Sequence, residues 1–153
     1  MTERTLVLVK PDGVQRLLVG RILGRYEERG LKLVGLKLMT VERDLAERHY
    51  AVHREKPFYT GLVDFITSGP LVAAVLEGPN AISIVRAMNG ATRPHEAVPG
   101  SIRGDLAVET AQNLVHASDS AETAASELAM WFAPGELVAY DREVDRWVLA
   151  PED

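Results

Sequence analysis

The sequence predicts an α/β chain of the α+β kind, a ferredoxin-like sandwich in which helices cover a four-stranded antiparallel sheet. Apolar runs typical of strands alternate with segments of helical period in the order β-α-β-(α,α)-β-α-loop-β-α. The pair of consecutive helices interrupts strict alternation, and no G-x-G-x-x-G follows the first strand. A Rossmann sheet therefore fits the pattern less well.

The first half of the chain contains two predicted strands and three predicted helices. The apolar run TLVLVK stops at the turn signal PDG, and Gly30 is placed to end the first helix. Gly35 breaks the alternation of the second strand, which predicts a bulge or bend there. The predicted elements are strand 5–10, helix 18–30, strand 31–40, helix 43–53 and helix 58–67.

The second half contains one long segment without a regular period. Residues 91–112 follow a predicted strand (71–78) and helix (79–90), and long loops of this kind are usually functional. A short strand, NLVHA (113–117), and a last helix come next. Asp119 and Glu122 have capping-box spacing at the start of that helix. In the tail, Trp147 and Leu149 are expected to pack on the body of the protein.

Composition excludes several classes of protein. The chain has 153 residues and 16.8 kDa, and we expect residues 1–153 to form a single domain. It has no cysteine, which removes disulfides and thiolate chemistry. The net charge of −5 makes a nucleic-acid partner unlikely on a general basic surface. The apolar run near the start is too short for a signal peptide or membrane span, so a cytoplasmic protein without a membrane partner is expected.

His116 is the most informative single residue. Periodicity alone favours a structural histidine, but the residue ends a strand just before a helix N-terminus, where free amides favour an anion. Glu127 lies beside the apolar stripe of that helix. By itself it is an ordinary solvated glutamate, but it could also fold back on His116 and fix the tautomer of the ring.

Three cations could serve a phosphate if the fold brings them together. Lys10 ends the first strand, Arg86 lies on a helix and Arg103 lies in the long loop. Each alone is compatible with an ordinary solvated side chain. Arginine offers a planar fork and lysine a point charge, so their convergence on one anion would indicate phosphate chemistry.

Two other constellations were weighed against this interpretation. His49 and His53 stand four residues apart, a spacing that can chelate zinc on a helix, but Tyr50 occupies the place of a metallopeptidase glutamate. His116, Ser118 and Asp119 have the residue types of a serine triad, but they are close in sequence and no G-x-S-x-G is present. Both alternatives are disfavoured.

Five segments together resemble the nucleoside diphosphate kinase family in their order and spacing. They are LVKPDGVQR (8–16), KPF (56–58), ITSGP (66–70), PGSIRGD (99–105) and NLVHASDS (113–120). The likeness runs from Thr5 to about Trp147. Each segment alone would be a weak signal, and the combination is specific.

The resemblance implies transfer of the terminal phosphate from a nucleoside triphosphate to a nucleoside diphosphate by a ping-pong mechanism. It implies that His116 carries the phosphate on Nδ1, that Glu127 orients the ring and that Ser118 completes the polar network. It implies Mg²⁺ held by the nucleotide phosphates and not directly by the protein. The other implied positions surround the nucleotide. At the phosphates they are Arg86, Thr92 and Arg103, and near the ribose 3′-hydroxyl they are Lys10 and Asn113, of which Lys10 also contacts the transferring group. Around the base they are Phe58, Leu62 and Thr110, and beside the pocket Tyr50.

Some positions depart from the common family pattern. Thr110 stands where an aliphatic residue is usual, Leu106 replaces a phenylalanine, and Gln112 replaces a frequent arginine. The C-terminal tail resembles that of the family's hexameric members, so the resemblance implies a homo-oligomer, a hexamer. The alternative function is a nucleotide-binding scaffold or regulator of the same fold without turnover.

Overall fold

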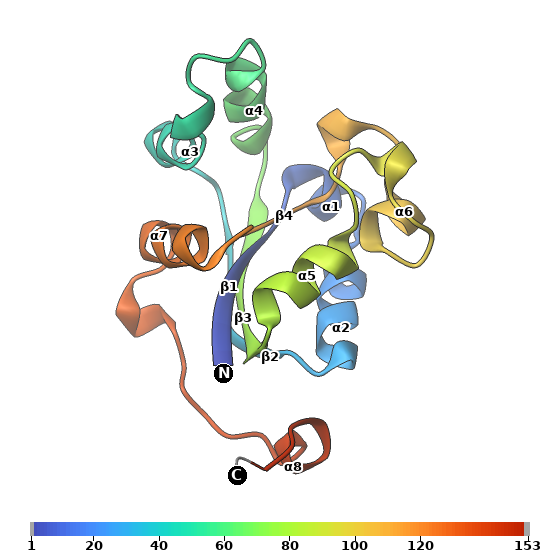
Figure 1. Cartoon of the computed structure of the whole chain (residues 1–153). Helices are drawn as coiled ribbons and strands as arrows, with labels where there is room; N and C mark the ends of the chain where they lie inside the picture. Colours follow the sequence, from blue (N-terminus) through green and yellow to red (C-terminus); the bar gives the residue numbers. More distant parts are fainter. Residues whose placement is uncertain (1, 152–153) are drawn as a thin grey trace.

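The computed structural model describes residues 2–151 and contains one antiparallel sheet, as predicted. The strands stand in the order β2-β3-β1-β4 (Figure 1). Their bounds are Thr2–Val9 for β1, Lys32–Met39 for β2, Leu71–Pro79 for β3 and Val115–Ala117 for β4. Each neighbouring pair is antiparallel, which confirms the predicted α+β sandwich.

Helices lie on both faces of this sheet. Among residues 2–151, no helix combines the length and the apolar composition that crossing a membrane requires. The helices are α1 (Pro11–Gln15), α2 (Val19–Arg29), α3 (Arg43–His49), α4 (Tyr59–Ile66), α5 (Ala81–Asn89), α6 (Ile102–Leu106), α7 (Ala121–Trp131) and α8 (Asp145–Val148).

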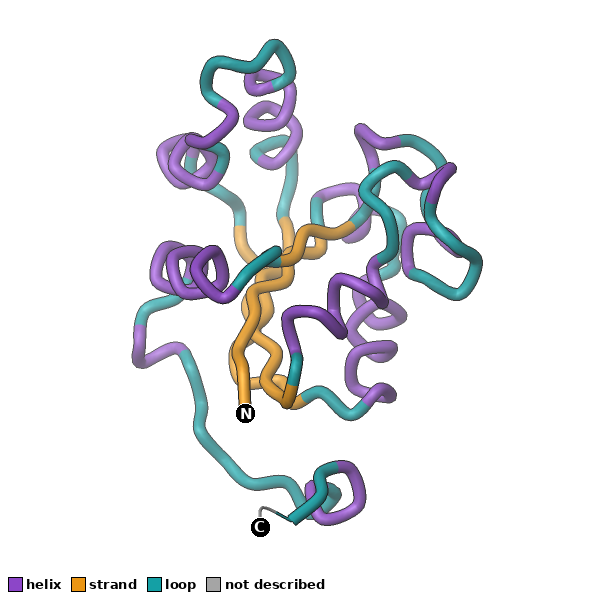
Figure 2. The backbone as a smooth tube through the Cα atoms, viewed as in Figure 1, coloured by secondary structure: helices purple, strands orange, loops and turns teal. Residues whose placement is uncertain are grey.

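The central strand β1 explains why its sequence is a continuous apolar run. Leu6 and Leu8 belong to the core under α3, α4 and α7, whereas Val7 and Val9 belong to the core under α2, α5 and α6. Figure 2 shows the strands between these two groups of helices. All four side chains are fully buried, so both faces of the strand must be apolar.

Several local predictions are confirmed and others are corrected. The register of β2 shifts between Leu33 and Gly35, as expected for a bulge, and Gly30 ends α2 with φ 108°. The last helix, however, is capped by Ser120 and not by Asp119, because the Ser120 hydroxyl accepts the Thr123 N–H. The PDG segment was predicted as a turn, and it begins the short helix α1.

The long segment 91–112 is more regular than expected. It contains helix α6 and two short 3-10 turns, and it is tied to α2 through Arg25. The guanidinium of Arg25 donates to the Gly100 carbonyl (2.5 Å) and to Asp105 (3.0 Å), and Asp105 accepts the Gly100 N–H. These contacts hold α6 beside α2 and make the segment part of the fold.

The C-terminal tail runs along the start of β2 (Figure 2). The Val138 N–H donates to the Val34 carbonyl at 2.8 Å, and the Tyr140 hydroxyl donates to the Leu33 carbonyl. The prediction that Trp147 packs on the body is wrong, since its side chain is 78% exposed. Polar contacts to the backbone of β2, the packing of Leu137 on the core and a bond from Arg142 to the Gly30 carbonyl attach the tail, and not the tryptophan.

Candidate active site

The strand that carries His116 is preceded by a strained residue. Leu114 has φ 73°, a left-handed conformation that costs a leucine about 1–2 kcal/mol. Its N–H donates to the buried carboxylate of Asp12 (3.0 Å), and its carbonyl accepts the N–H of Lys10 (2.8 Å). Because Leu114 leaves the extended conformation, β4 starts at Val115 and is two residues shorter than predicted. His116 then pairs with Leu8 of β1.

Glu127 fixes one side of the His116 ring. Its Oε2 lies 2.9 Å from Nε2 of His116, and its Oε1 accepts the hydroxyl of Ser118 at 2.6 Å. Burial opposes ionisation of this carboxyl, but the bonds from His116 and Ser118 keep the pKa of Glu127 below its usual value. A carboxylate accepts a proton from Nε2, which leaves the lone pair on Nδ1. The triad interpretation is wrong, because Ser118 bonds to Glu127.

A cavity of about 380 Å³ opens beside this ring. The His116 side chain is 25% exposed, so the ring is neither sealed in the core nor free in solvent. Tyr50, which was predicted beside the pocket, lines the cavity, and burial raises its pKa to about 12. The lining residues are Arg48, His49, Tyr50, Val52, His53, Arg86, His116, Ala117, Asp119, Thr123, Ser126, Glu127 and Met130.

Arg86 reaches this cavity from α5. It is an exposed side chain that lines the same cavity as His116, and its Nη1 lies 3.5 Å from the Ala117 carbonyl. Its remaining donors are therefore available to an anion near the histidine. Among the predicted cations, Arg86 has the clearest access to the ring.

Lys10 is joined to the next predicted residues through Asn113. Its ammonium donates to Asn113 Oδ1 at 2.8 Å, and the amide of Asn113 donates to the Thr92 carbonyl at 2.9 Å. Burial and the nearby Arg103 lower the pKa of Lys10 to about 8, although Asp12 opposes this shift. The structure thus brings three predicted residues into one hydrogen-bonded chain.

Arg103 is buried, and its guanidinium binds backbone carbonyl groups. Its guanidinium donates to the carbonyls of Asn113 (3.2 Å), Gly90 (2.8 Å) and Val115 (2.6 Å). Burial lowers its pKa to about 10, so it stays charged at neutral pH. Each terminal nitrogen keeps a second N–H that an anion can use. Sequence reasoning gave Arg103 a phosphate role and did not predict this structural one.

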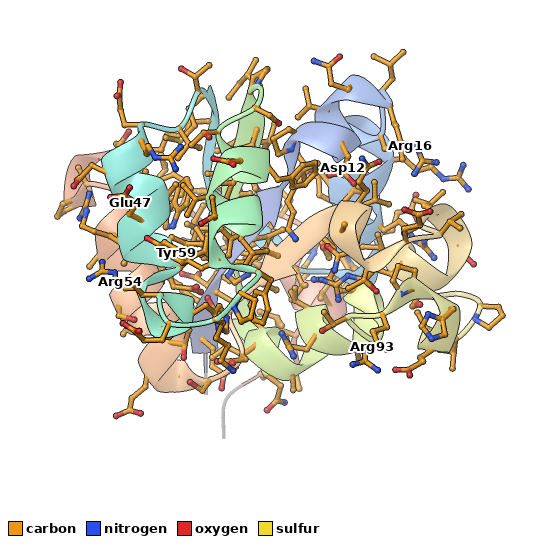
Figure 3. All side chains as sticks on the ribbon, turned by 90° about the horizontal axis from the view of Figure 1, so that it is seen from above. Asp12, Arg16, Glu47, Arg54, Tyr59 and Arg93 are labelled. Atoms are coloured by element: carbon orange, nitrogen blue, oxygen red, sulfur yellow. The ribbon has the colours of Figure 1, made fainter. Side chains whose placement is uncertain are left out.

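The residues predicted around the base do not line the cavity at His116, although Phe58 contacts His53, which does. Phe58 is 50% exposed, and its ring lies 5.3 Å from that of His53. Leu62 packs in part against the core under α4, and exposed Thr110 begins a short turn. Figure 3, a view from above, shows Arg54 and Tyr59 on one side of the molecule, and both are close to Phe58 in the sequence. Arg93, in the segment 91–112, lies on the other side. None of the three base residues is among the described residues that line the cavity at His116.

Sequence reasoning missed how His49 is used. The zinc pair with His53 was disfavoured from the sequence, and in the structure Nδ1 of His49 instead accepts the indole N–H of Trp131 at 3.1 Å. Its ring lies 4.6 Å from that of His116, and burial together with the nearby His116 lowers its pKa to about 3. Nothing in the sequence links position 49 to position 116, and only the packing of α3 against α7 brings them together.

The site combines a histidine that has a lone pair on Nδ1 with an orienting carboxylate and nearby cations. On this fold, these features define a phosphotransferase. The sequence pattern described as nucleoside diphosphate kinase matches residues 3–137. A nucleoside diphosphate kinase of Thermomicrobium roseum is 58% identical over 147 residues, 96% of this chain and 99% of that one. The chain belongs to the nucleoside diphosphate kinase family.

Solved structures agree with this assignment. A halophilic nucleoside diphosphate kinase from Halobacterium salinarum, determined in complex with CDP, has a TM-score of 0.96 and 49% identity. The similarity covers 98% of this chain and 100% of that one. A family protein from Babesia bovis has a TM-score of 0.93 and 49% identity, covering 95% and 99%. The ferredoxin-like fold predicted from the sequence is thereby confirmed.

Proposed function

We propose that this nucleoside diphosphate kinase carries the terminal phosphate on Nδ1 of His116. The observation that carries the proposal is the 2.9 Å contact between Nε2 of His116 and Glu127. It commits the proton of the ring to Nε2, so that Nδ1 keeps its lone pair as a nucleophile. Family membership supplies the reaction, from nucleoside triphosphate to nucleoside diphosphate.

The transfer has two half-reactions. The Nδ1 lone pair attacks the terminal phosphorus, the bond from that phosphorus to the bridging oxygen breaks, and the diphosphate leaves with the electron pair. A second diphosphate then attacks the phosphorus through a terminal oxygen, and the bond between phosphorus and Nδ1 breaks. Phosphorylation puts positive charge on the ring, which the Glu127 carboxylate stabilises, with Ser118 holding its other oxygen.

The cations and their partners are proposed to position the phosphates. Arg86 is assigned to them because it shares the cavity with His116, and Arg103 because two of its N–H groups remain after its carbonyl bonds. Thr92 and Asn113 are assigned through the hydrogen-bonded chain that starts at Lys10. Lys10 is proposed to contact the transferring group and the ribose hydroxyl region.

Mg²⁺ is proposed to arrive with the nucleotide. The carboxylates that line the cavity are Asp119 and Glu127, and both oxygens of Glu127 are taken by His116 and Ser118. Asp119 alone is too few protein oxygens for a direct magnesium site, because this ion takes six oxygen ligands and phosphates and waters would have to supply the rest. Bound to the phosphates, the ion would screen their negative charge.

The nucleotide base is proposed to lie against Phe58, with Leu62 beneath it and Thr110 opposite. The half-exposed ring of Phe58 supports this, because one side of it is open to a base. Stacking accepts any base, because every base has a π-face. We therefore expect the protein to accept nucleotides with any of the common bases.

Replacing Phe58 with alanine should weaken nucleotide binding by about 1–3 kcal/mol, the range for a lost base stack. Titration of ADP measures the change, and the matched control is Phe65→Ala, which removes a phenylalanine at the other end of α4. An unchanged dissociation constant in Phe58→Ala would remove the stacking role.

Activity should decline as the pH rises through about 8, because Lys10 loses its proton there. The pKa is lowered, so the charged form that helps hold the phosphates is present below about pH 8 and lost above it. A profile of kcat/KM against pH measures this limb. Lys10→Arg keeps its charge and should move the limb to higher pH. A profile identical to the wild type would contradict the assignment.

Covalent labelling separates turnover from the scaffold alternative. The pure protein is incubated with γ-labelled ATP and Mg²⁺, and label on the protein is tested for loss in acid and survival in base. Acid-labile, base-stable label absent from His116→Asn supports the phosphohistidine. No label, or label that persists in His116→Asn, defeats it.

We also propose that the protein assembles as a homo-oligomer, a hexamer. Leu36 and Leu38 on the edge strand β2 are 52% and 68% exposed, and Trp147 is 78% exposed, so apolar surface remains for partner copies. A solution mass of one chain by light scattering would refute this.

The cytoplasmic location and the single domain over residues 1–153 remain proposals, testable by cell fractionation and by a single unfolding transition.

A further inference from the structure

His49 contacts the proposed phosphate carrier through a side chain that is almost fully buried. It is the last residue of α3, and its side chain is 1% exposed. Its ring meets those of His116, Tyr50 and Trp131 edge to face, at centroid distances of 4.6, 4.7 and 5.3 Å. A buried imidazole in contact with a nucleophilic imidazole has no part in the mechanism above.

Trp131 fixes the tautomer of this ring. The indole N–H can only donate, and it donates to Nδ1 of His49 at 3.1 Å. Nδ1 therefore carries no proton, and the proton of the neutral ring is on Nε2. Trp131 is 2% exposed, so water does not compete for this bond.

The fixed tautomer affects Glu127. Its Oε2 lies 3.6 Å from Nδ1 of His49 and 2.9 Å from Nε2 of His116. With the indole hydrogen on Nδ1, His49 has no hydrogen to offer this oxygen. The opposite tautomer would compete with His116 for the same carboxylate oxygen.

The same three side chains form a metal-binding constellation. His49, His116 and Glu127 each offer a ligand atom, and these atoms lie within 4.8 Å of one another. Two imidazoles and a carboxylate are a common zinc donor set. A metal needs the nitrogen lone pair, and the indole N–H of Trp131 already occupies the one on Nδ1 of His49.

We propose that the bond from Trp131 to His49 is a positioning device that reserves Glu127 for His116 and keeps these three groups from closing on a transition metal. The role of Glu127 here rests on the proposed function of His116. The metal-excluding role does not, because it depends only on which lone pairs are free.

The test compares two Trp→Phe variants. Trp131→Phe removes the buried indole N–H, and Trp147→Phe makes the same change at a residue that does not line the cavity. Zinc ion alone is titrated against each protein, in competition with a chromophoric chelator. Trp131→Phe should bind zinc about ten- to a hundredfold more tightly than the wild type and Trp147→Phe. Adding His49→Phe to it should remove the gain.

Phosphorylation of His116 supplies the second readout. In Trp131→Phe it should be inhibited at correspondingly lower zinc and restored by a chelator. Zinc affinity equal to the wild type in folded Trp131→Phe would overturn the proposal, whatever the outcome of labelling. If that variant does not fold, nitrogen-15 NMR of the wild type decides. A protonated Nδ1 on His49 overturns the proposal, and a protonated Nε2 supports it.

Discussion

His116→Asn should lower kcat by about four orders of magnitude or more, the scale on which loss of a covalent nucleophile acts in other enzymes. Asparagine is similar in size and polar, so the cavity and the hydrogen bonds around it should survive. Its amide nitrogen has no available lone pair, and the phosphoryl group has no carrier. Coupled measurement of triphosphate formation, with the label on the protein, gives the result.

His95→Asn is the matched control for this substitution. His95 is an exposed histidine in the 3-10 turn Pro94–Glu96, outside the lining of the cavity among the described residues. It should leave kcat within a factor of about two. Nucleotide binding by His116→Asn should also stay near the wild-type value, since the cations are untouched. Substantial turnover in that variant would mean that another group carries the phosphate.

Glu127→Gln should be the next most damaging change, with kcat lower by about 10²- to 10⁴-fold. The upper limit is the effect of turning the orienting carboxylate of a catalytic histidine into an amide. The amide cannot stabilise the positive ring of phosphohistidine, and one of its two orientations would donate toward Nε2. That orientation places the ring proton on Nδ1, where it blocks attack.

Glu122→Gln tests the same chemical change at the start of the same helix. Glu122 is exposed in the first turn of α7, so this variant should keep nearly full activity. The rate of His116 phosphorylation in single turnover separates the chemical step from nucleotide binding. A small effect of Glu127→Gln, similar to that of Glu122→Gln, would contradict the orienting role.

Elements with strong periodicity were predictable from the sequence. The glycine after α2 and the apolar run of β1 report local geometry, and the structure confirms both. The alternation in β2 predicted the strand itself, but Leu36 and Leu38 of that pattern are exposed. Two predictions were wrong, the cap of α7 and the start of β4, and both depend on which backbone N–H a polar side chain accepts. Asp119 and Ser120 both suit a helix cap, and spacing alone could not show which one accepts the N–H. Likewise, the left-handed Leu114 depends on Asp12, which is distant in sequence.

The candidate site was predictable in its residues but not in their partners. Motif spacing selected His116 and Glu127, and the structure places them 2.9 Å apart. It could not show that His49 is held by Trp131, since α3 and α7 meet only in the folded chain. It also could not show that Arg103 is buried. An arginine in an irregular segment is ordinarily solvated, and three backbone carbonyls reverse that preference.

The three carbonyl bonds of Arg103 set a limit on redesigning the enzyme. One guanidinium links the residue after α5, a residue two positions before β4, and β4 itself, so the end of α5 and the histidine strand are held together. An engineer who shortens or grafts the intervening stretch to change nucleotide preference would have to keep this cation and all three acceptors. Otherwise selectivity and foldedness would be lost together, and a screen for altered selectivity would recover few soluble clones.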